Sequence, residues 1–322
     1  MTTIKKLTLK LKSGVLTDLQ SDTIFGHFAW RFKEFHGEEK LIEFLKFFKN
    51  GNPIFTISDG LLQNKDDIFF PYPLKQTPYK ANCKNKKERL KSFLARKEAK
   101  SVKYISLQSL NAFLQGNIAK YEGTNFLAKV ETPQYKHDLR VNVGIDRNTF
   151  TSSDGKLFTI NAKYLDEKFR SVLFIKILDE QRFSEFKCED ILISVFEIGY
   201  GKKKSSGFGQ FEVIGSIEEY NEFQEPDESD GFLSLSHYLP SNDDSIEDAH
   251  YEINVKYGKL GEESALSANP FKKPLLLMRP GSCFITNYKK EFYGRAADRI
   301  SDYKPNIVHN GIAFTLRCKF TV

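Results

Sequence analysis

The start of the chain alternates leucine with polar residues, and this alternation sets the first constraint on the fold. Leu7, Leu9 and Leu11 stand two positions apart, as in a β-strand that buries one face. Apolar residues then recur at helical spacing from 24 to 35, and Ser21 or Asp22 can cap the N-terminus of that helix. We therefore predict a strand followed by a helix at the start of an α+β fold.

The patterns up to residue 215 continue in the same way. Helical periodicity marks residues 37–51 and 188–198, whereas residues 172–178 and 210–215 have the apolar patterns of strands. Glutamate and aspartate near the start of the 188–198 segment favour a helix N-terminus there.

Residues 139–160 predict a β-hairpin, and Asp154 and Gly155 supply its turn residues. All these segments follow the βαββαβ order of ferredoxin-like or RNA-recognition-motif folds. In such folds the helices cover one face of a four-stranded sheet and the other face is free. We predict a domain of this kind for residues 1–215, with a long insertion and the hairpin as its additions.

An acidic segment separates this domain from the C-terminal part. Residues 216–252 contain twelve acidic and no basic residues, whereas the rest of the chain carries a net charge of +18. We interpret residues 216–250 as an acidic, solvated linker. Residues 251–322 alternate as short strands with few helical signals, which predicts a second, degenerate ferredoxin-like domain.

The two basic parts favour a polyanionic partner such as RNA, and a merely soluble surface is the alternative. Residues 80–103 hold ten Lys or Arg and two Glu. They form either a solvated helical insertion or a cationic arm that contacts RNA.

The sequence supports no metal site, cofactor site or membrane segment. Its four cysteines (Cys83, Cys188, Cys283 and Cys318) and six histidines are dispersed without metal-ligand spacing. We expect reduced thiols and a cytoplasmic location. No apolar run approaches the ~20 residues that span a bilayer.

The most informative segment lies between the predicted helix at 188–198 and the strand at 210–215. It consists of Gly199, Tyr200, Gly201, Lys202, Lys203, Lys204, Ser205, Ser206, Gly207, Phe208 and Gly209. Phe196 stands where a Walker phosphate loop needs glycine, and the order of helix and strand is reversed. The composition instead suits single-stranded RNA, because glycines admit a phosphodiester, lysines neutralise it and Tyr200 or Phe208 can stack on a base. The alternative is a flexible connector.

These residues also carry a resemblance. GYGKKKSSGFGQFEV is similar to the glycine-rich loop of the RAMP superfamily, the repeat-associated proteins of CRISPR interference complexes. That loop lies between the second helix and the last strand of a ferredoxin-like domain. Together with SDTIFG at 21–26 and NVGIDR at 142–147, the segment makes the chain resemble the fourth subunits of type III-A (Csm) complexes. The resemblance covers most of residues 1–215, and the C-terminal third carries no such motif.

The resemblance implies a non-catalytic subunit that caps the complex and holds the 5′ repeat-derived handle of the crRNA. It implies contact with the large signature subunit, which has a polymerase/cyclase-like domain, with an adjacent backbone RAMP subunit and transiently with target RNA. The hairpin would be a thumb that wedges apart the guide–target duplex. Beyond the loop, the implied RNA-binding residues are Phe25, Gly26, His27, Asn142, Asp146 and Arg147.

Other interpretations stay open at this point. Arg279, near Phe271 and two lysines, either extends an RNA track or belongs to a solvated turn. His27 could be the general acid or base of a repeat-processing endoribonuclease, although no orienting partner is evident. For Asp22, a capping role is favoured over a catalytic one. A protein-interaction scaffold with basic faces is the third class.

Overall fold

The structure is a computed structural model. It describes residues 2–65, 67–74, 102–117, 135–146, 148–261, 269–286, 288–304 and 306–320, with only the backbone at 153 and 154. Cys83, Arg147 and nearly all of the basic insertion at 80–103 lie outside these residues. The other three cysteines are buried free thiols, as predicted.

The first sheet is built around β1 and is antiparallel throughout its pairings. β1 (Thr3–Leu11) lies between β8 (Arg170–Ile177) and β9 (Phe211–Glu219). On its far side, β8 pairs with β2 (Phe55–Ile57) and β3 (Leu61–Gln63). β4 (Ile68–Pro71) and β5 (Tyr104–Ile105) extend this edge. The order is that of a four-stranded ferredoxin-like sheet with added strands.

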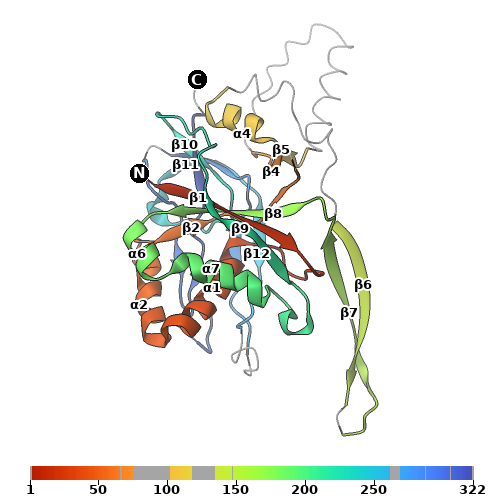
Figure 1. The fold of residues 1–322 in the computed structure, drawn as a ribbon. Helices are drawn as coiled ribbons and strands as arrows, with labels where there is room; N and C mark the ends of the chain where they lie inside the picture. The colour runs from red at the N-terminus through yellow and green to blue at the C-terminus, as the bar shows by residue number, and fades with distance from the viewer. Residues whose placement is uncertain are drawn as a thin grey trace.

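Helices cover one face of this sheet, below it in Figure 1. α1 (Ser21–His36), α2 (Glu38–Lys49), α6 (Glu180–Glu185) and α7 (Cys188–Ile198) bury phenylalanines and aliphatic residues against it. Leu7 and Leu9 of β1 face this layer, as the alternation of the first strand predicted. The short α4 (Leu107–Leu114) lies at the opposite side.

The cap of α1 differs from the prediction. Ser21 and Asp22 lie inside the first turn, and neither side chain caps the helix. Instead, Asp59 accepts the backbone N–H of Ser21 at 3.0 Å from the loop before β3. Asp22 is buried and ion-pairs with Lys256. A charge-compensating partner on the C-terminal strands therefore replaces the predicted capping role.

The other face of the first sheet is covered, which corrects the prediction of a free face. A second sheet has the order β11 (Ile246–His250), β14 (Cys283–Thr286), β10 (Gly231–Ser234) and β17 (Thr315–Cys318). Val172 and Phe174 of β8 share one hydrophobic cluster with Leu233 and Phe314.

The acidic segment is therefore no solvated linker. β9 continues into it, and β10 and β11 belong to it, because several of its apolar residues, such as Tyr220, Leu233 and Leu235, reach the core. A second ferredoxin-like domain is not confirmed: the described residues after 219 form strands and a 3-10 turn at Asn242–Asp244 but no α-helix. The remaining pairs there are β12 (Ile253–Lys256) with β13 (Leu275–Met278) and β15 (Ala296–Ala297) with β16 (His309–Asn310).

The predicted hairpin is present, and it is longer than expected. β6 (Tyr135–Ile145) pairs with β7 (Ser152–Leu165), and the ribbon projects well beyond the body of the molecule (Figure 1). The turn lies at residues 146–151, where Asp146 accepts the backbone N–H of Asn148 at 2.8 Å. Gly155 has a φ of +71° at a register shift within β7, so it forms a bulge and not the predicted turn.

Candidate nucleic-acid interface

The glycine-rich loop lies between α7 and β9, as predicted, and its two ends are tied to the body. The N–H of Tyr200 donates to the carbonyl of Gly209 at 2.8 Å, and the N–H of Gly209 donates to the carbonyl of Gly14 at 2.9 Å. Gly209 has a φ of +64°, and a Cβ there would stand 1.9 Å from the carbonyl oxygen of Tyr200. Glycine is thus required for this closure.

Tyr200 anchors the loop and does not stack on RNA, which corrects that prediction. Its ring is 0% exposed, and its hydroxyl donates to the carbonyl of Asp18 at 2.8 Å. Burial raises the pKa of this hydroxyl well above its usual value.

Two further hydrogen bonds orient the loop toward the start of α1. The N–H of Gly201 donates to Nε2 of His27 at 3.1 Å, and the N–H of Lys202 donates to Oγ1 of Thr17 at 3.0 Å. The His27 ring also lies 4.9 Å from the Tyr200 ring between centroids. Because Nε2 accepts a backbone N–H of the loop, His27 has a positioning role in this geometry.

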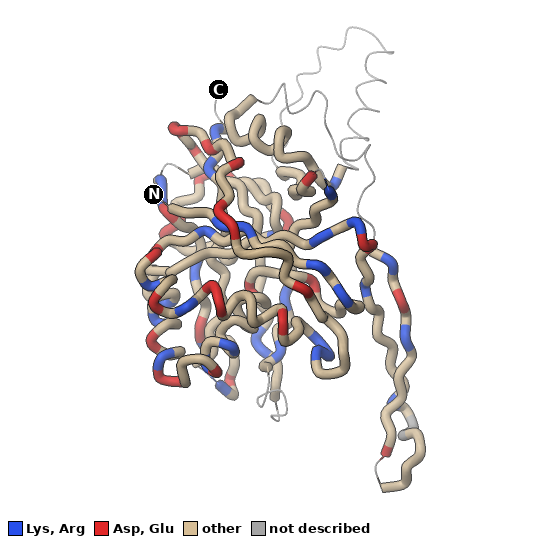
Figure 2. Tube along the Cα trace, in the orientation of Figure 1, with Lys and Arg blue, Asp and Glu red and all other residues tan. Residues whose placement is uncertain are grey.

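The tip of the loop is the accessible part. Lys202, Ser205, Ser206 and Gly207 are exposed, while Lys203, Lys204 and Phe208 are partly buried. Figure 2 shows basic residues on this loop and on the base of the neighbouring hairpin. Three lysines on one turn concentrate positive charge, which is the chemistry that contacts phosphate groups.

The hairpin contributes to the same surface through residues that the sequence analysis did not single out. The Arg140 guanidinium lies 5.6 Å from the centre of the Phe208 ring, and Nζ of Lys203 lies 5.0 Å from the centre of the Phe158 ring. Arg140 pairs with Asp138, and that hydrogen bond raises the pKa of Arg140. Strand alternation of the hairpin, which places Arg140 of β6 and Phe158 of β7 on one face, could have indicated this surface from the sequence.

The opposite face of the hairpin is apolar and exposed. Strand alternation places Leu139, Val141, Val143 and Ile145 on it, and Leu157 pairs with Val143. The hairpin therefore presents a cationic and aromatic face to the loop and an aliphatic face to its surroundings.

The other predicted RNA-binding residues do not all gather here. Phe25 is 2% exposed in the core, 4.7 Å from the ring of Phe48, so its predicted RNA contact is wrong. Gly26 is exposed beside His27, with nothing within 4 Å of an added Cβ. Asn142 and Asp146 lie along the hairpin and at its tip. Arg279 belongs to the C-terminal strands and pairs with Glu252 at 3.4 Å.

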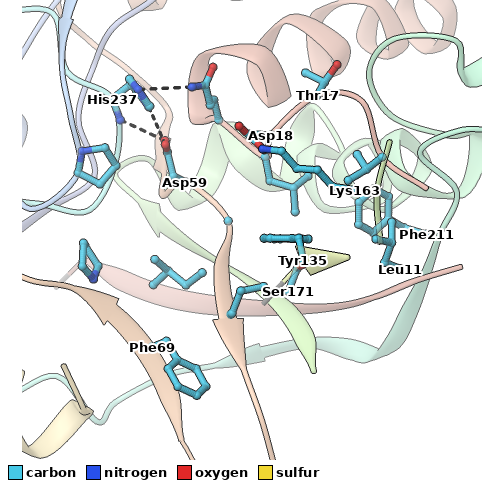
Figure 3. A pocket seen from close by; sticks show the side chains of 18 of the residues that line it. Leu11, Thr17, Asp18, Asp59, Phe69, Tyr135, Lys163, Ser171, Phe211 and His237 are labelled. Atoms are coloured by element: carbon cyan, nitrogen blue, oxygen red, sulfur yellow. Dashed lines mark hydrogen bonds and ion pairs between the residues drawn. The ribbon is translucent and has the colours of Figure 1, made fainter. Parts of the chain in front are cut away.

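A second group of polar residues lines a cavity of about 360 Å³ behind residues 17–20, at the base of the hairpin (Figure 3). Nδ1 of His237 lies 2.6 Å from Asp59, and Nζ of Lys163 lies 2.6 Å from Asp18. Burial alone would lower the pKa of His237, but the charge of Asp59 outweighs it and the pKa is raised. The pKa of Asp59 is lowered, since His237 and two backbone N–H groups outweigh its burial.

Within the described residues, no three His, Cys, Asp or Glu side chains cluster as metal ligands. No helix in the described part of the chain is long and apolar enough to cross a membrane.

Comparison with solved structures gives the fold a family context. The chain matches a chain of the Csm3-Csm4 subcomplex of the type III-A CRISPR-Cas interference complex with a TM-score of 0.66 and 16% sequence identity, over 97% of this chain and 99% of that one. It also matches the Csm1-Csm4 cassette in complex with cA4, with a TM-score of 0.62, 17% identity and 99% coverage of both chains. For the same cassette in complex with pppApA, the TM-score is 0.60 and the sequence identity is 15%, over 100% of this chain and 99% of that one.

Csm4 is the component common to these assemblies, and the chain has its fold over nearly its whole length. The resemblance expected from the sequence is thus confirmed at the level of the fold. No family model and no curated protein sequence matches the chain.

Proposed function

We propose that this chain is a non-catalytic RNA-binding subunit of a type III-A CRISPR interference complex. It caps one end of the complex and holds the 5′ repeat-derived handle of crRNA on the glycine-rich loop. Its partners are the large signature subunit and an adjacent backbone RAMP subunit, in the cytoplasm.

The observation that carries the proposal is the construction of the loop. Its backbone N–H groups are held by Gly14 and Thr17, between β1 and α1, and by the His27 side chain of α1. Lys202, Ser205, Ser206 and Gly207 remain exposed beside Arg140 and Phe158 of the hairpin. A rigid base with an exposed cationic tip suits a single strand, which offers phosphates, 2′-hydroxyls and unstacked bases. The fold shared with Csm4 chains supports the same function.

The thumb role belongs to the same proposal. A long ribbon with one cationic and one aliphatic face can contact phosphates on one side and press against base pairs on the other. The hairpin then separates guide from target at the end of the duplex, with Asn142 and Asp146 along its distal half.

The endoribonuclease alternative has less support. His27 accepts the Gly201 N–H, and Asp22 is buried in an ion pair with Lys256. Neither residue stands ready for proton transfer to an RNA hydroxyl.

The test is to co-express the tagged chain with its neighbouring subunits and guide RNA, and to sequence the ends of the retained RNA. We expect one common repeat-derived 5′ end with wild type, and loss of this RNA with Lys202→Ala, Lys203→Ala and Lys204→Ala combined. Retained RNA of random sequence would reduce the function to generic RNA binding. Fresh ends that vanish with His27→Ala would establish cleavage instead.

A further inference from the structure

The cavity at the base of the hairpin is lined by both aromatic rings and polar side chains, and the proposed role of the glycine-rich loop assigns it no function. Phe69, Tyr104 and Tyr135 supply aromatic rings, and Thr17, Ser171 and Lys163 supply polar groups. Its volume of about 360 Å³ falls within the ~300–1,000 Å³ of pockets that enclose small organic ligands.

Three hydroxyl groups line this cavity. They belong to Tyr104, Tyr135 and Ser171, and Ser171 is only 4% exposed. Burial raises the pKa of both tyrosines, so each hydroxyl stays protonated and can both donate and accept. Figure 3 places Tyr135 and Ser171 at the centre of the pocket. A ligand in the cavity can therefore form hydrogen bonds with these hydroxyl groups.

The charged groups of the cavity are already satisfied. Asp59 pairs with His237, and Asp18 pairs with Lys163. No buried charge is left for a phosphate or a carboxylate, which favours a ligand that is neutral, flat and edged with donors and acceptors. A nucleobase has these properties, because it stacks on aromatic rings and its edge exchanges hydrogen bonds with hydroxyls.

The wall of the cavity is shared with the glycine-rich loop. Thr17 lines the cavity and accepts the N–H of Lys202, and Asp18 lines it and accepts the hydroxyl of Tyr200. An RNA strand bound at Lys202 would therefore be separated from the cavity by Thr17. On the hairpin side, Lys163 is at the mouth and its ammonium lies 5.8 Å from the Tyr135 ring.

We propose that this cavity receives an unpaired nucleobase, supplied by the RNA strand on the glycine-rich loop. The proposal rests on the proposed function for its source of bases. It assigns the stacking surface to Tyr135 and the reading of the base edge to the hydroxyls of Tyr104, Tyr135 and Ser171.

The experiment uses the full chain in its purified complex and the RNA that copurifies with it, resynthesised with 2-aminopurine at one position at a time. Adenosine 5′-monophosphate alone is the second probe. We expect one labelled position to become protected from a soluble quencher, and Ser171→Leu, which fills the cavity, to abolish that protection. Tyr104→Phe and Ser171→Ala should each weaken RNA binding roughly 2- to 10-fold, the loss of one hydrogen bond.

Ser184→Leu on α6, an exposed serine outside the cavity, is the matched control and should leave the protection intact. Binding of the monophosphate to wild type but not to Ser171→Leu, with no protected RNA position, would keep the nucleobase site and assign it to a free nucleotide. If RNA is retained through the loop lysines but no position is protected and the monophosphate does not bind, the inference is wrong and the proposed function stands. If no RNA is retained, the proposed function fails and the monophosphate still tests the cavity.

Discussion

At the scale of single residues, a glycine-to-alanine substitution adds one methyl group, and its effects on protein stability and on RNA binding can be measured separately. Gly26 is exposed within α1, and an added Cβ would meet nothing within 4 Å. Gly26→Ala should therefore raise the free energy of unfolding by about 0.5–1 kcal/mol, because alanine favours the helix. If RNA passes beside His27, the same methyl group should weaken RNA binding. Urea unfolding and RNA titration of one preparation measure both effects.

Gly37→Ala is the control for this substitution. Gly37 has a φ of +85° between α1 and α2, so alanine should cost about 1–3 kcal/mol of stability there and leave RNA affinity unchanged. A Gly26→Ala variant that binds RNA as well as wild type would remove Gly26 from the interface.

His309 makes a prediction about pH. Burial lowers its pKa from 6.5 to about 4, because the loss of hydration outweighs the attraction of Asp22 and the charges of Lys272 and Lys256 act in the same direction as burial. The folded state thus holds His309 neutral while the unfolded chain takes up a proton. Stability is present above about pH 6.5 and is lost as the pH falls toward 4, by up to about 3 kcal/mol. His309→Gln should flatten this part of the stability curve, measured by urea unfolding at several pH values.

The exposed His137 on the hairpin provides the comparison. His137→Gln should leave the acid sensitivity as in wild type. Equal pH dependence in wild type and His309→Gln would show that other groups cause the acid loss.

At this scale the sequence indicated which side chains have the chemistry to bind RNA, but not which of them are buried in the core. Phe25 and Tyr200 carry the right chemistry for stacking, but their rings complete the core, and a one-dimensional pattern does not separate the two uses. Arg140 and Phe158 were missed because their proximity to the loop depends on how the hairpin leaves the sheet.

At the scale of elements, the glycine-rich loop predicts a specific dependence on salt. Replacing Lys202, Lys203 and Lys204 together by alanine should weaken RNA binding. It should also flatten the log–log salt slope by up to ~0.7 for each lost phosphate contact on a single strand. Filter binding over a series of salt concentrations measures the slope.

The matched control removes the same charge from α2. Lys40, Lys46 and Lys49 lie on that helix, two of them in ion pairs with Glu43 and Asp298. Their combined replacement by alanine should leave the slope nearly unchanged. Equal flattening in both triple variants would mean that net charge, and not the loop, governs binding.

Several elements of residues 1–215 were predictable, because each of them has a strong period and a local signal at its end, whereas β2 to β5, α4 and α6 were not predicted. The helix at Cys188–Ile198 agrees with its predicted range, and β1 contains the three alternating leucines that predicted it. The turn of the hairpin was misplaced because Gly155 favours a positive φ both in a turn and in a bulge. Only the pairing register, which the sequence does not contain, distinguishes the two.

At the scale of the whole molecule, charge misled the division into domains. The acidic segment 216–250 also contains Phe232, Leu233 and Leu235, which are fully buried. The segment therefore contributes exposed acidic residues to the surface and buried apolar residues to the core. The second sheet covers the face of the first sheet that an RNA-recognition motif leaves open, which is why the proposed function assigns RNA to the loop and the hairpin.

The shared core predicts that the two sheets unfold together. Leu233 of β10 is 0% exposed and packs in one cluster with Val172 and Phe174 of β8. Leu233→Ala should cost about 2–5 kcal/mol, and the slowest-exchanging amides of β8 should lose as much protection as those of β17. Leu276→Ala, at an exposed position on β13, should change both by less than about 0.5 kcal/mol. Native-state hydrogen exchange resolves the two sheets separately. Protection lost in β17 but kept in β8 would mean that a linker joins two independent domains after all.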